Sequence, residues 1–239
     1  MKKLIFAGIG LVAFGAALVF GLLRGGVLPP PLNIDDGAPH LLGVDVSHHQ
    51  GRIDWVALAG HDIAFAFMKA TEGGDWIDPK FQDNWRAAKR AGLPRGAYHF
   101  FTLCRDAGDQ AEHFLATVGN MQGALLPALD AEHMGPCRES AAMTDVAGGV
   151  LTFLDTVHGA TGMRPVIYTT KEFYTAHLKG KTPGERFWLR SLITQPTYHS
   201  DDWLFWQYSG NGRRRGVNGA VDLNIFDGDQ DALDALIIR

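Results

Sequence analysis

From about residue 41 the chain alternates short apolar runs with amphipathic segments. The apolar runs predict β-strands, and the segments between them have the 3.6-residue spacing of helices. The predicted strands are residues 41–46, 63–70, 95–101, 124–130 and 165–169, and the predicted helices include residues 79–91, 109–118 and 140–158. This alternation predicts right-handed crossovers and a parallel sheet.

The pattern changes after residue 169. One short helix, residues 171–178, is followed by three strand-like runs, residues 187–191, 203–208 and 219–223, with little room for helices between them. Five βα units and three further strands give eight strands, which is enough to close a barrel. We therefore predict an α/β fold, a TIM-like (β/α)5(β)3 barrel, in a single domain over residues 41–239.

Two runs support an interior sheet. Residues 63–68 and 125–129 are continuously apolar, as expected of parallel strands that are buried on both faces. An open, doubly wound sheet is the alternative. However, no glycine-rich phosphate-binding turn follows the first strand.

The N-terminal segment predicts export. Residues 4–23 carry no charge and follow Lys2 and Lys3, and a helix of that length just crosses a bilayer. We expect a signal anchor or signal peptide in residues 1–24 and a proline-containing linker in residues 25–40. The positive end stays in the cytoplasm, so the barrel would be anchored outside the inner membrane, or secreted if the segment is cleaved.

Composition and charge reduce the number of possible functions. The chain has 46% hydrophobic and 20% charged residues, as ordinary globular proteins do, and three of its 22 basic residues but none of its 26 acidic residues lie in the first 24 positions. The remainder is acidic, which argues against a nucleic-acid partner. The one basic cluster, residues 213–215, is flanked by Asn and Gly and predicts a solvated turn.

Polar residues end several of the apolar strands. They include Asp45, Lys69, His99, Asp130, Glu132, Tyr168, Gln207 and Asp222. Because barrel enzymes place their active sites at the carboxyl ends of the strands, we expect these side chains to converge on one pocket.

Asp130 and Glu132 are the strongest catalytic candidates. They are two residues apart on an extended strand, so both side chains project to the same side. Their mutual repulsion should keep one of them protonated near neutral pH, while the other remains ionised. Cleavage of an acetal needs such a pair, because one carboxyl protonates the leaving oxygen and the other, ionised, supports the positive charge that develops at the sugar carbon. An isolated D-x-E triplet is a weak signal, but here a buried strand leads into it.

Other chemistry is less favoured. His48 and His49 suggest a metal site, but adjacent residues on an extended chain point to opposite sides, so we expect no metal. No G-x-S-x-G turn indicates a nucleophilic serine. Among the aromatic residues near strand ends, Tyr98, Tyr168 and Trp206 are the candidates for stacking on sugars, and core packing is the alternative for each.

Seven motifs occur in the order typical of one family. They are residues 43–51 (GVDVSHHQG), 69–73 (KATEG), 96–100 (GAYHF), 129–132 (LDAE), 165–169 (PVIYT), 206–209 (WQYS) and 221–224 (VDLN). Together they resemble glycoside hydrolase family 25, the Chalaropsis-type lysozymes or N-acetylmuramidases. The chain departs from the family at residues 188–191 (WLRS), where an alanine-bearing strand is common.

The resemblance implies a flattened barrel and hydrolysis of the β-1,4 bond between N-acetylmuramic acid and N-acetylglucosamine in peptidoglycan. It implies that Glu132 is the general acid, that Asp130 assists the second step, and that Asp45 and Asp222 are further acids of the pocket. Lys69, His99 and Gln207 join the three aromatic residues as expected substrate contacts. The family uses no metal and no cofactor.

Two matters stay open at this level. A disulfide between Cys104 and Cys137 is expected, because these residues follow neighbouring strands of the predicted barrel and the chain is expected to be exported; two unpaired thiols are the alternative. A catalytically silent saccharide-binding protein, or a hydrolase of another polysaccharide, is the alternative to a muramidase.

Overall fold

The computed structural model describes residues 39–135, 143–192, 194–199 and 202–239. The predicted anchor, most of the linker and Cys137 lie outside the described residues. Within the described part, none of the helices combines the length and apolar character needed to cross a membrane.

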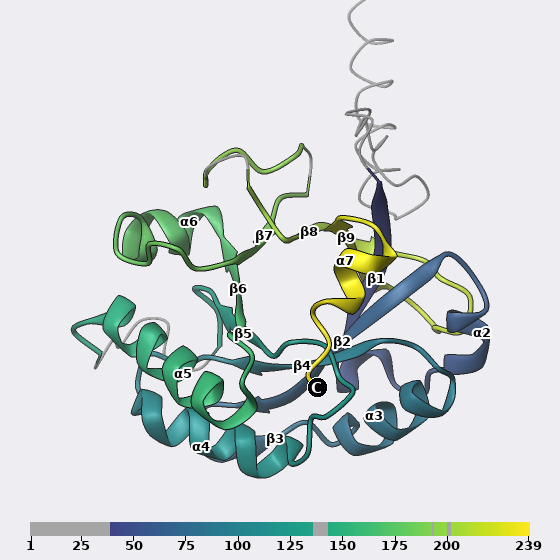
Figure 1. The fold of residues 1–239 in the computed structure, drawn as a ribbon, viewed down its shortest axis with the longest axis horizontal. Helices are drawn as coiled ribbons and strands as arrows, with labels where there is room; N and C mark the ends of the chain where they lie inside the picture. Colours follow the sequence, from purple (N-terminus) through teal and green to yellow (C-terminus); the bar gives the residue numbers. More distant parts are fainter. Residues whose placement is uncertain (1–38, 136–142, 193, 200–201) are drawn as a thin grey trace, which may run out of the picture.

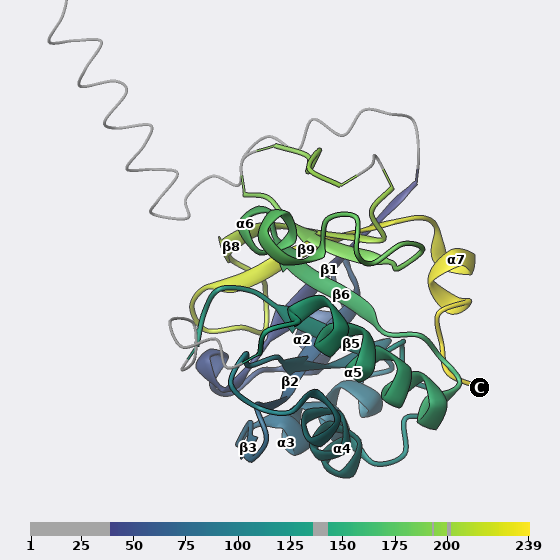
Figure 2. The same cartoon turned by 90° about the vertical axis from the view of Figure 1, so that its left-hand side faces the viewer.

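Eight strands form a closed barrel (Figures 1 and 2). They are β1 (His40–Val46), β2 (Ile63–Glu72), β4 (Arg95–Phe100), β5 (Ala128–Ala131), β6 (Val166–Thr170), β7 (Phe187–Arg190), β8 (Phe205–Gly212) and β9 (Val221–Asp227), and β1 closes the barrel by pairing with both β2 and β9. The two-residue strand β3 (Trp76–Ile77) folds back on the end of β2. The predicted eight-stranded barrel is confirmed.

Five crossovers precede β7. They contain α2 (Trp55–Ala59), α3 (Phe81–Arg90), α4 (Ala107–Val118), α5 (Val146–Thr161), and α6 (Lys171–Phe173) with the π-helical turn η2 (Tyr174–Leu178). The described parts of the connections after β7 and β8 contain no helix. Helices α3, α4 and α5 therefore cover one part of the barrel wall, and loops cover the part formed by the last strands (Figure 1).

The long helices have clear local start and stop signals. The side chains of Asp106 and Asp145 accept hydrogen bonds from the backbone N–H groups of the first turns of α4 and α5. At the other ends, Gly119 and Gly162 have φ of 67° and 71°, which glycine adopts at little cost.

The direction of β9 differs from the predicted parallel sheet, in which Asp222 was expected at the carboxyl end of the last strand. Strand β9 is antiparallel to both of its neighbours, β1 and β8, whereas the pairings among the other seven barrel strands are parallel. It also runs longer than the predicted 219–223. A short connection returns the chain in the opposite direction, so the first residues of β9, not its last, lie at the carboxyl edge of the barrel.

Side chains alternate between two cores. One core fills the barrel interior and includes Phe65, Phe67, Phe205 and Phe226. The other lies between the barrel and its surroundings, and contains the intervening residues of the same strands, such as Ala66. Successive residues of a strand point to opposite faces, so position along each strand decides which side chains reach the interior.

Close backbone approaches accommodate the interior rings. A Cβ added to Gly43 would lie 2.3 Å from the Phe65 ring, and one added to Gly96 would lie 2.3 Å from the Phe67 ring. Both glycines are therefore needed because the phenylalanine rings occupy the space that a side chain would take.

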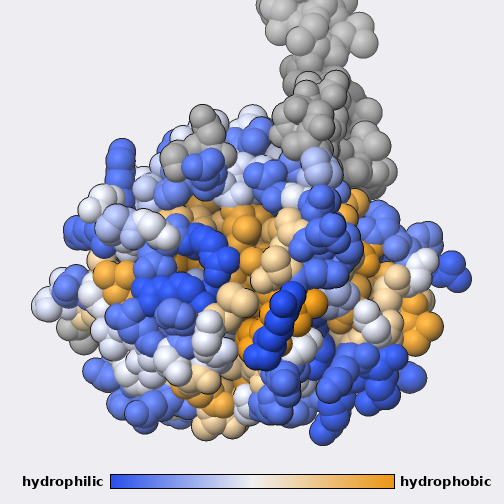
Figure 3. All heavy atoms as spheres, viewed as in Figure 1, coloured by the Kyte–Doolittle hydropathy of each residue, from blue (hydrophilic) through white to orange (hydrophobic). Residues whose placement is uncertain are grey.

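The C-terminal segment covers the amino end of the barrel. Helix α7 (Gln230–Asp234) is followed by Leu236, whose carbonyl accepts from the backbone N–H of Leu126 just before β5. Leu233 and Leu236 pack on the interior core. Figure 3 shows apolar side chains gathered near the middle of the face drawn in Figure 1, with polar side chains around them.

Candidate active site

A cleft of about 280 Å³ opens at the carboxyl end of the barrel strands. Eight of the predicted site residues line it: Asp45, Lys69, Tyr98, Asp130, Glu132, Tyr168, Gln207 and Asp222. Its other lining residues are Ser47, His49, Phe100, Met134, Trp188 and Arg190. The fold thus brings together acids that lie up to 177 positions apart, Asp45 and Asp222.

Asp130 and Glu132 come from β5 and the residue just beyond it. Burial is the main cause that raises the pKa of both carboxyls, and the charge of Glu132 raises the pKa of Asp130 further. The two carboxyls titrate as a pair, and this pair holds a proton to higher pH than an exposed carboxyl does.

Asp130 also has an unused acceptor. Its Oδ1 atom is buried and has no hydrogen-bond partner among the described residues. A buried polar atom without a partner is costly in a folded protein. In a cleft, such an atom is available to a bound ligand.

Asp45 lies deeper and has several partners. Its Oδ2 atom accepts hydrogen bonds from Asn224 Nδ2 at 2.8 Å and from Gln207 Nε2 at 3.0 Å. Burial raises the pKa of Asp45, and the hydrogen bonds from Asn224, Gln207 and Asp222 oppose that increase. Burial, followed by the charge of Asp45, raises the pKa of Asp222 to about 8.

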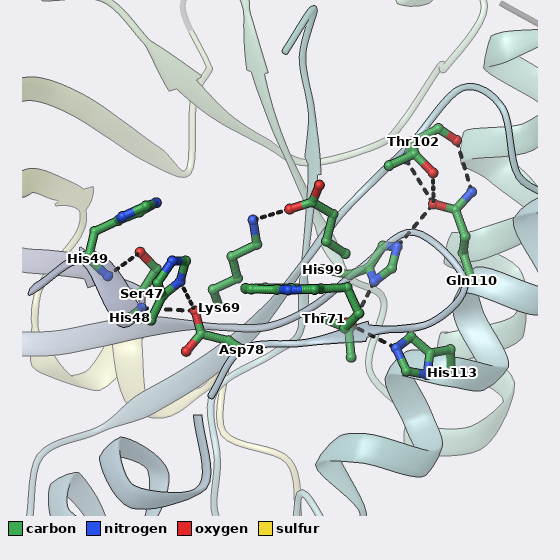
Figure 4. A network of polar contacts seen from close by, with 12 residues as sticks. Ser47, His48, His49, Lys69, Thr71, Asp78, His99, Thr102, Gln110 and His113 are labelled. Atoms are coloured by element: carbon green, nitrogen blue, oxygen red, sulfur yellow. Dashed lines mark hydrogen bonds and ion pairs between the residues drawn. The ribbon is translucent and has the colours of Figure 1, made fainter. Parts of the chain in front are cut away.

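Two cations balance these acids. The Lys69 ammonium lies 2.7 Å from Glu72 Oε2, and 5.0 and 4.5 Å from the ring centres of Trp76 and Phe100 (Figure 4). Arg190, at the end of β7, lowers the pKa values of nearby carboxyls, among them Glu132. The cleft therefore contains both negative and positive side chains, and the positive ones limit how far burial raises the pKa values of the carboxyls.

The histidine pair lies beside the cleft on η1 (His48–Gln50). The backbone N–H and the Nδ1 atom of His48 contact Asp78 Oδ2 at 2.8 and 2.9 Å, and Ser47 caps the turn (Figure 4). Only His49 lines the cleft. In the described part of the chain, no three His, Cys, Asp or Glu side chains are grouped so as to hold a metal ion.

His99 does not reach the cleft, contrary to the prediction. It is fully buried on the helix side of β4, where Nδ1 lies 2.7 Å from Thr71 Oγ1 and Nε2 lies 3.2 Å from Gln110 Oε1 (Figure 4). Its ring stacks on Phe153 of α5. The alternation along β4 explains this position, because the preceding residue, Tyr98, faces the cleft.

Trp206 is the second prediction that the structure corrects. Its indole Nε1 donates to the Ser191 carbonyl at 2.7 Å, and its ring packs against Trp203 and Tyr208 in the outer core. The next residue, Gln207, faces the cleft instead. Trp206 is therefore a core residue, the alternative that the sequence had left open.

Several residues in and beneath the cleft were not predicted, and three of them interact with its acids, directly or through one another. Trp188 and Arg190 both point into the cleft from β7, and Asn224 is fully buried beneath it. Alternation along the strand could have found them, because Trp188 and Arg190 share one face of β7, and Asn224 shares a face of β9 with Asp222. The departure at residues 188–191 thus places an arginine in the cleft.

Comparisons with known proteins agree with this architecture. The family described as "Glycosyl hydrolases family 25" matches residues 44–217. The chain is 38% identical over 201 residues to the uncharacterized protein YegX of Escherichia coli O157:H7, a match that covers 82% of this chain and 72% of that protein. It is 36% identical over 206 residues to lysozyme M1 of Streptomyces globisporus, covering 81% of this chain and 70% of that protein.

The solved structures give the same result. A family 25 glycosyl hydrolase from Bacillus anthracis superposes with a TM-score of 0.75 at 31% identity, covering 85% of this chain and 95% of that chain. The family match extends over most of the chain and includes both β5, which leads to Asp130 and Glu132, and the strands that supply Asp45 and Arg190. The chain belongs to glycosyl hydrolase family 25 and is a glycoside hydrolase.

Proposed function

We propose that the protein is a muramidase that hydrolyses the β-1,4 bond between N-acetylmuramic acid and N-acetylglucosamine in peptidoglycan. The observation that carries this proposal is the placement of Asp130 and Glu132 in one cleft, both with raised pKa values, within a family 25 barrel. The similarity to lysozyme M1 supports the choice of substrate.

The proposed chemistry uses the two carboxyls in different roles. Glu132 donates a proton to the leaving glycosidic oxygen, and the pair retains that proton near neutral pH because burial disfavours two charges. Asp130 supports the positive charge that develops at the sugar carbon, directly or by orienting the N-acetyl group of the substrate. The partnerless Oδ1 of Asp130 is available for that contact.

The aromatic side chains suit a sugar ligand. Tyr98, Tyr168 and Trp188 line the cleft beside the acids. Ring faces of this kind pack against the apolar faces of sugars, while the polar groups fix their orientation. Met134 is exposed at the mouth of the cleft and extends its apolar surface.

We also propose that residues 1–24 attach the protein to the inner membrane, with the barrel on the outer side, because an uncharged stretch follows Lys2 and Lys3. Attachment would keep the enzyme close to the cell wall. Fractionation of cells that express the full chain tests this: recovery in the membrane fraction supports it, and recovery only as a shortened form in the medium refutes it.

The decisive test of activity is digestion of purified peptidoglycan, followed by mass analysis of the new ends. We expect fragments with N-acetylmuramic acid at the reducing end, and loss of at least 100-fold in rate for Glu132→Gln. Glu112→Gln, which changes an exposed glutamate of α4, is the matched control and should retain activity. Equal traces from wild type and Glu132→Gln would exclude Glu132 as the acid.

The same experiment also distinguishes the proposed substrate from other substrates that a family 25 barrel could cleave. Reducing-end N-acetylglucosamine would assign the enzyme to the other glycosidic bond of peptidoglycan. Absence of cleavage of peptidoglycan together with cleavage of a chitin oligosaccharide would assign it to another polysaccharide.

A further inference from the structure

A chain of hydrogen bonds beneath the cleft has a fixed direction. The indole Nε1 of Trp188 donates to Asn224 Oδ1 at 2.9 Å, and Asn224 Nδ2 donates to Asp45 Oδ2 at 2.8 Å. An indole N–H can only donate, so the Asn224 side chain must present its oxygen to Trp188 and its NH₂ group to Asp45. Asn224 is 0% exposed, and no water can replace either contact without a rearrangement.

A second arm reaches the same oxygen. Tyr168 Oη donates to Gln207 Oε1 at 3.0 Å, and Gln207 Nε2 donates to Asp45 Oδ2 at 3.0 Å. That oxygen therefore accepts two N–H groups. A carboxyl oxygen that already accepts two donors is not the one that carries a proton, and N–H donors favour the ionised form of the group that accepts them.

Asp222 faces this carboxylate from β9. The two residues are paired across β1 and β9, and their side chains share a hydrogen bond that lowers the pKa of Asp45 and raises that of Asp222. Two carboxyls can share a hydrogen bond only while one of them keeps its proton. Both hydrogen-bond chains, through Asn224 and through Gln207, end in N–H donors to Asp45. They therefore favour a charged Asp45 and a protonated Asp222.

We infer that Asn224, fixed by Trp188, is a positioning residue that with Gln207 holds Asp45 as the ionised member of a second acid pair and leaves the proton of that pair on Asp222. This inference deepens the proposed muramidase function and rests on it for its consequence, although not for its test. It assigns a role to Asn224, which does not line the cleft and therefore does not touch a bound substrate.

The consequence is a fixed negative charge next to the catalytic pair. The charge of Asp45 raises the pKa values of both Asp130 and Glu132. An ionised Asp45 therefore helps Glu132 to keep its proton at higher pH. The charged and titratable groups that surround Asp45 from the other strands are Asp222, Arg190, Asp130, Glu132, Lys69, Tyr98 and Tyr168, and His49 of η1 lines the same cleft.

A direct test does not need activity. The full chain, labelled with ¹³C at the aspartate γ-carbons, is titrated from pH 5 to 9 by NMR. The signals of the two residues are assigned by their loss in Asp45→Asn and Asp222→Asn. We expect the Asp45 signal to have the carboxylate shift throughout, and the Asp222 signal to titrate near pH 8. A protonated Asp45 at pH 6 beside an ionised Asp222 would overturn the inference.

The role of Asn224 is tested by Asn224→Leu, which keeps the volume but removes the donor. The Asp45 signal should then titrate within the measured range, and the alkaline limb of the kcat/KM profile on peptidoglycan should move to lower pH by about one unit, because a neutral Asp45 no longer supports the proton of Glu132. If Asn224→Leu does not fold, Trp188→Phe is titrated instead, since it removes the indole N–H that orients Asn224 and keeps an aromatic ring at this position. It should shift the Asp45 signal in the same direction.

The matched control is a second tryptophan–asparagine pair of the same fold. Trp55 Nε1 donates to Asn84 Oδ1 at 3.3 Å between α2 and α3, away from the cleft. Asn84→Leu should lower stability without moving the Asp45 titration. Equal effects of the two substitutions, or none for Asn224→Leu, would reduce Asn224 to a structural residue. Absence of peptidoglycan cleavage with the expected titrations would instead refute the proposed function alone.

Discussion

Asp45 of β1 and Asp222 of β9 lie directly opposite each other at the carboxyl edge of the barrel. They meet there because β9 runs antiparallel to the other strands, so its second residue lies level with the end of β1. A parallel strand would have placed Asp222 near the opposite end of the barrel. The shared hydrogen bond of these two acids is thus a product of the way in which the barrel closes.

This pair makes stability depend on pH. The pKa of Asp222 is about 8 in the folded chain, raised from 3.8 by burial and by Asp45, so the folded state keeps a proton that the unfolded state releases. Wild type therefore loses stability as pH rises from about 4 to about 8. Asp222→Asn removes this loss while it retains an N–H that can donate to Asp45.

We expect Asp222→Asn to unfold at higher urea concentration than wild type above pH 6. The difference in unfolding free energy should grow with pH by up to roughly 1.4 kcal/mol per unit and then level off above pH 8. Urea unfolding at intervals between pH 5 and 9 measures it. A difference that stays constant over that range would show that Asp222 carries no such proton.

Arg190 should act in the opposite direction on the catalytic pair. Its charge lowers the pKa of Glu132, so Arg190→Gln should raise that pKa and move the alkaline limb of the kcat/KM profile to higher pH by about half a unit to one unit. Arg105→Gln, which removes an exposed arginine outside the cleft lining, is the control. A shift to lower pH for Arg190→Gln would contradict the electrostatic role.

Much of this arrangement could be predicted from the sequence, because it depends on local patterns. The apolar runs predict the strands, and the polar and aromatic residues near the strand ends include eight of the cleft residues. The direction of β9 could not be predicted in the same way. Periodicity shows that a strand exists but not which way it runs, and a short loop allows an antiparallel return as readily as any other.

The errors at His99 and Trp206 have one cause. Each lies beside a residue that was also assigned to the pocket, Tyr98 and Gln207, and neighbours on a strand cannot both face the interior. The ring nitrogens of His99 contact Thr71 of β2 and Gln110, and the position of Gln110 depends on the packing of α4. Both members of each pair were candidates for the pocket. Side-chain alternation along the strand, if applied to each pair, would have retained only one member as a cleft residue.

The predicted disulfide remains open to a simple measurement. Cys104 lies in the loop after β4, no cysteine among the described residues is free, and Cys137 lies outside them. We expect the oxidised, exported protein to show no reactive thiol in urea, and Cys137→Ser to show one. Loss of the bridge should lower the unfolding free energy by about 3 kcal/mol. Two reactive thiols in the unreduced wild type would refute the bridge.

The network around Gln110 predicts a substitution that affects stability alone. Gln110 Oε1 accepts from the Thr102 backbone N–H at 2.8 Å and lies 3.2 Å from His99 Nε2, while its Nε2 donates to the Thr102 carbonyl at 3.1 Å (Figure 4). All three residues are buried. Gln110→Leu would therefore leave several buried polar groups without partners, which costs about 3 kcal/mol in total.

Because this network lies on the helix side of β4, Gln110→Leu should leave the pH profile of kcat/KM in place while the urea midpoint falls. Gln82→Leu is the matched control, since Gln82 makes an exposed hydrogen bond to the Thr117 carbonyl and its loss should change stability by less than about 0.5 kcal/mol. If Gln110→Leu instead moved the pH profile, His99 would be coupled to the catalytic acids through β4, and the separation between helix side and cleft side proposed for this strand would fail.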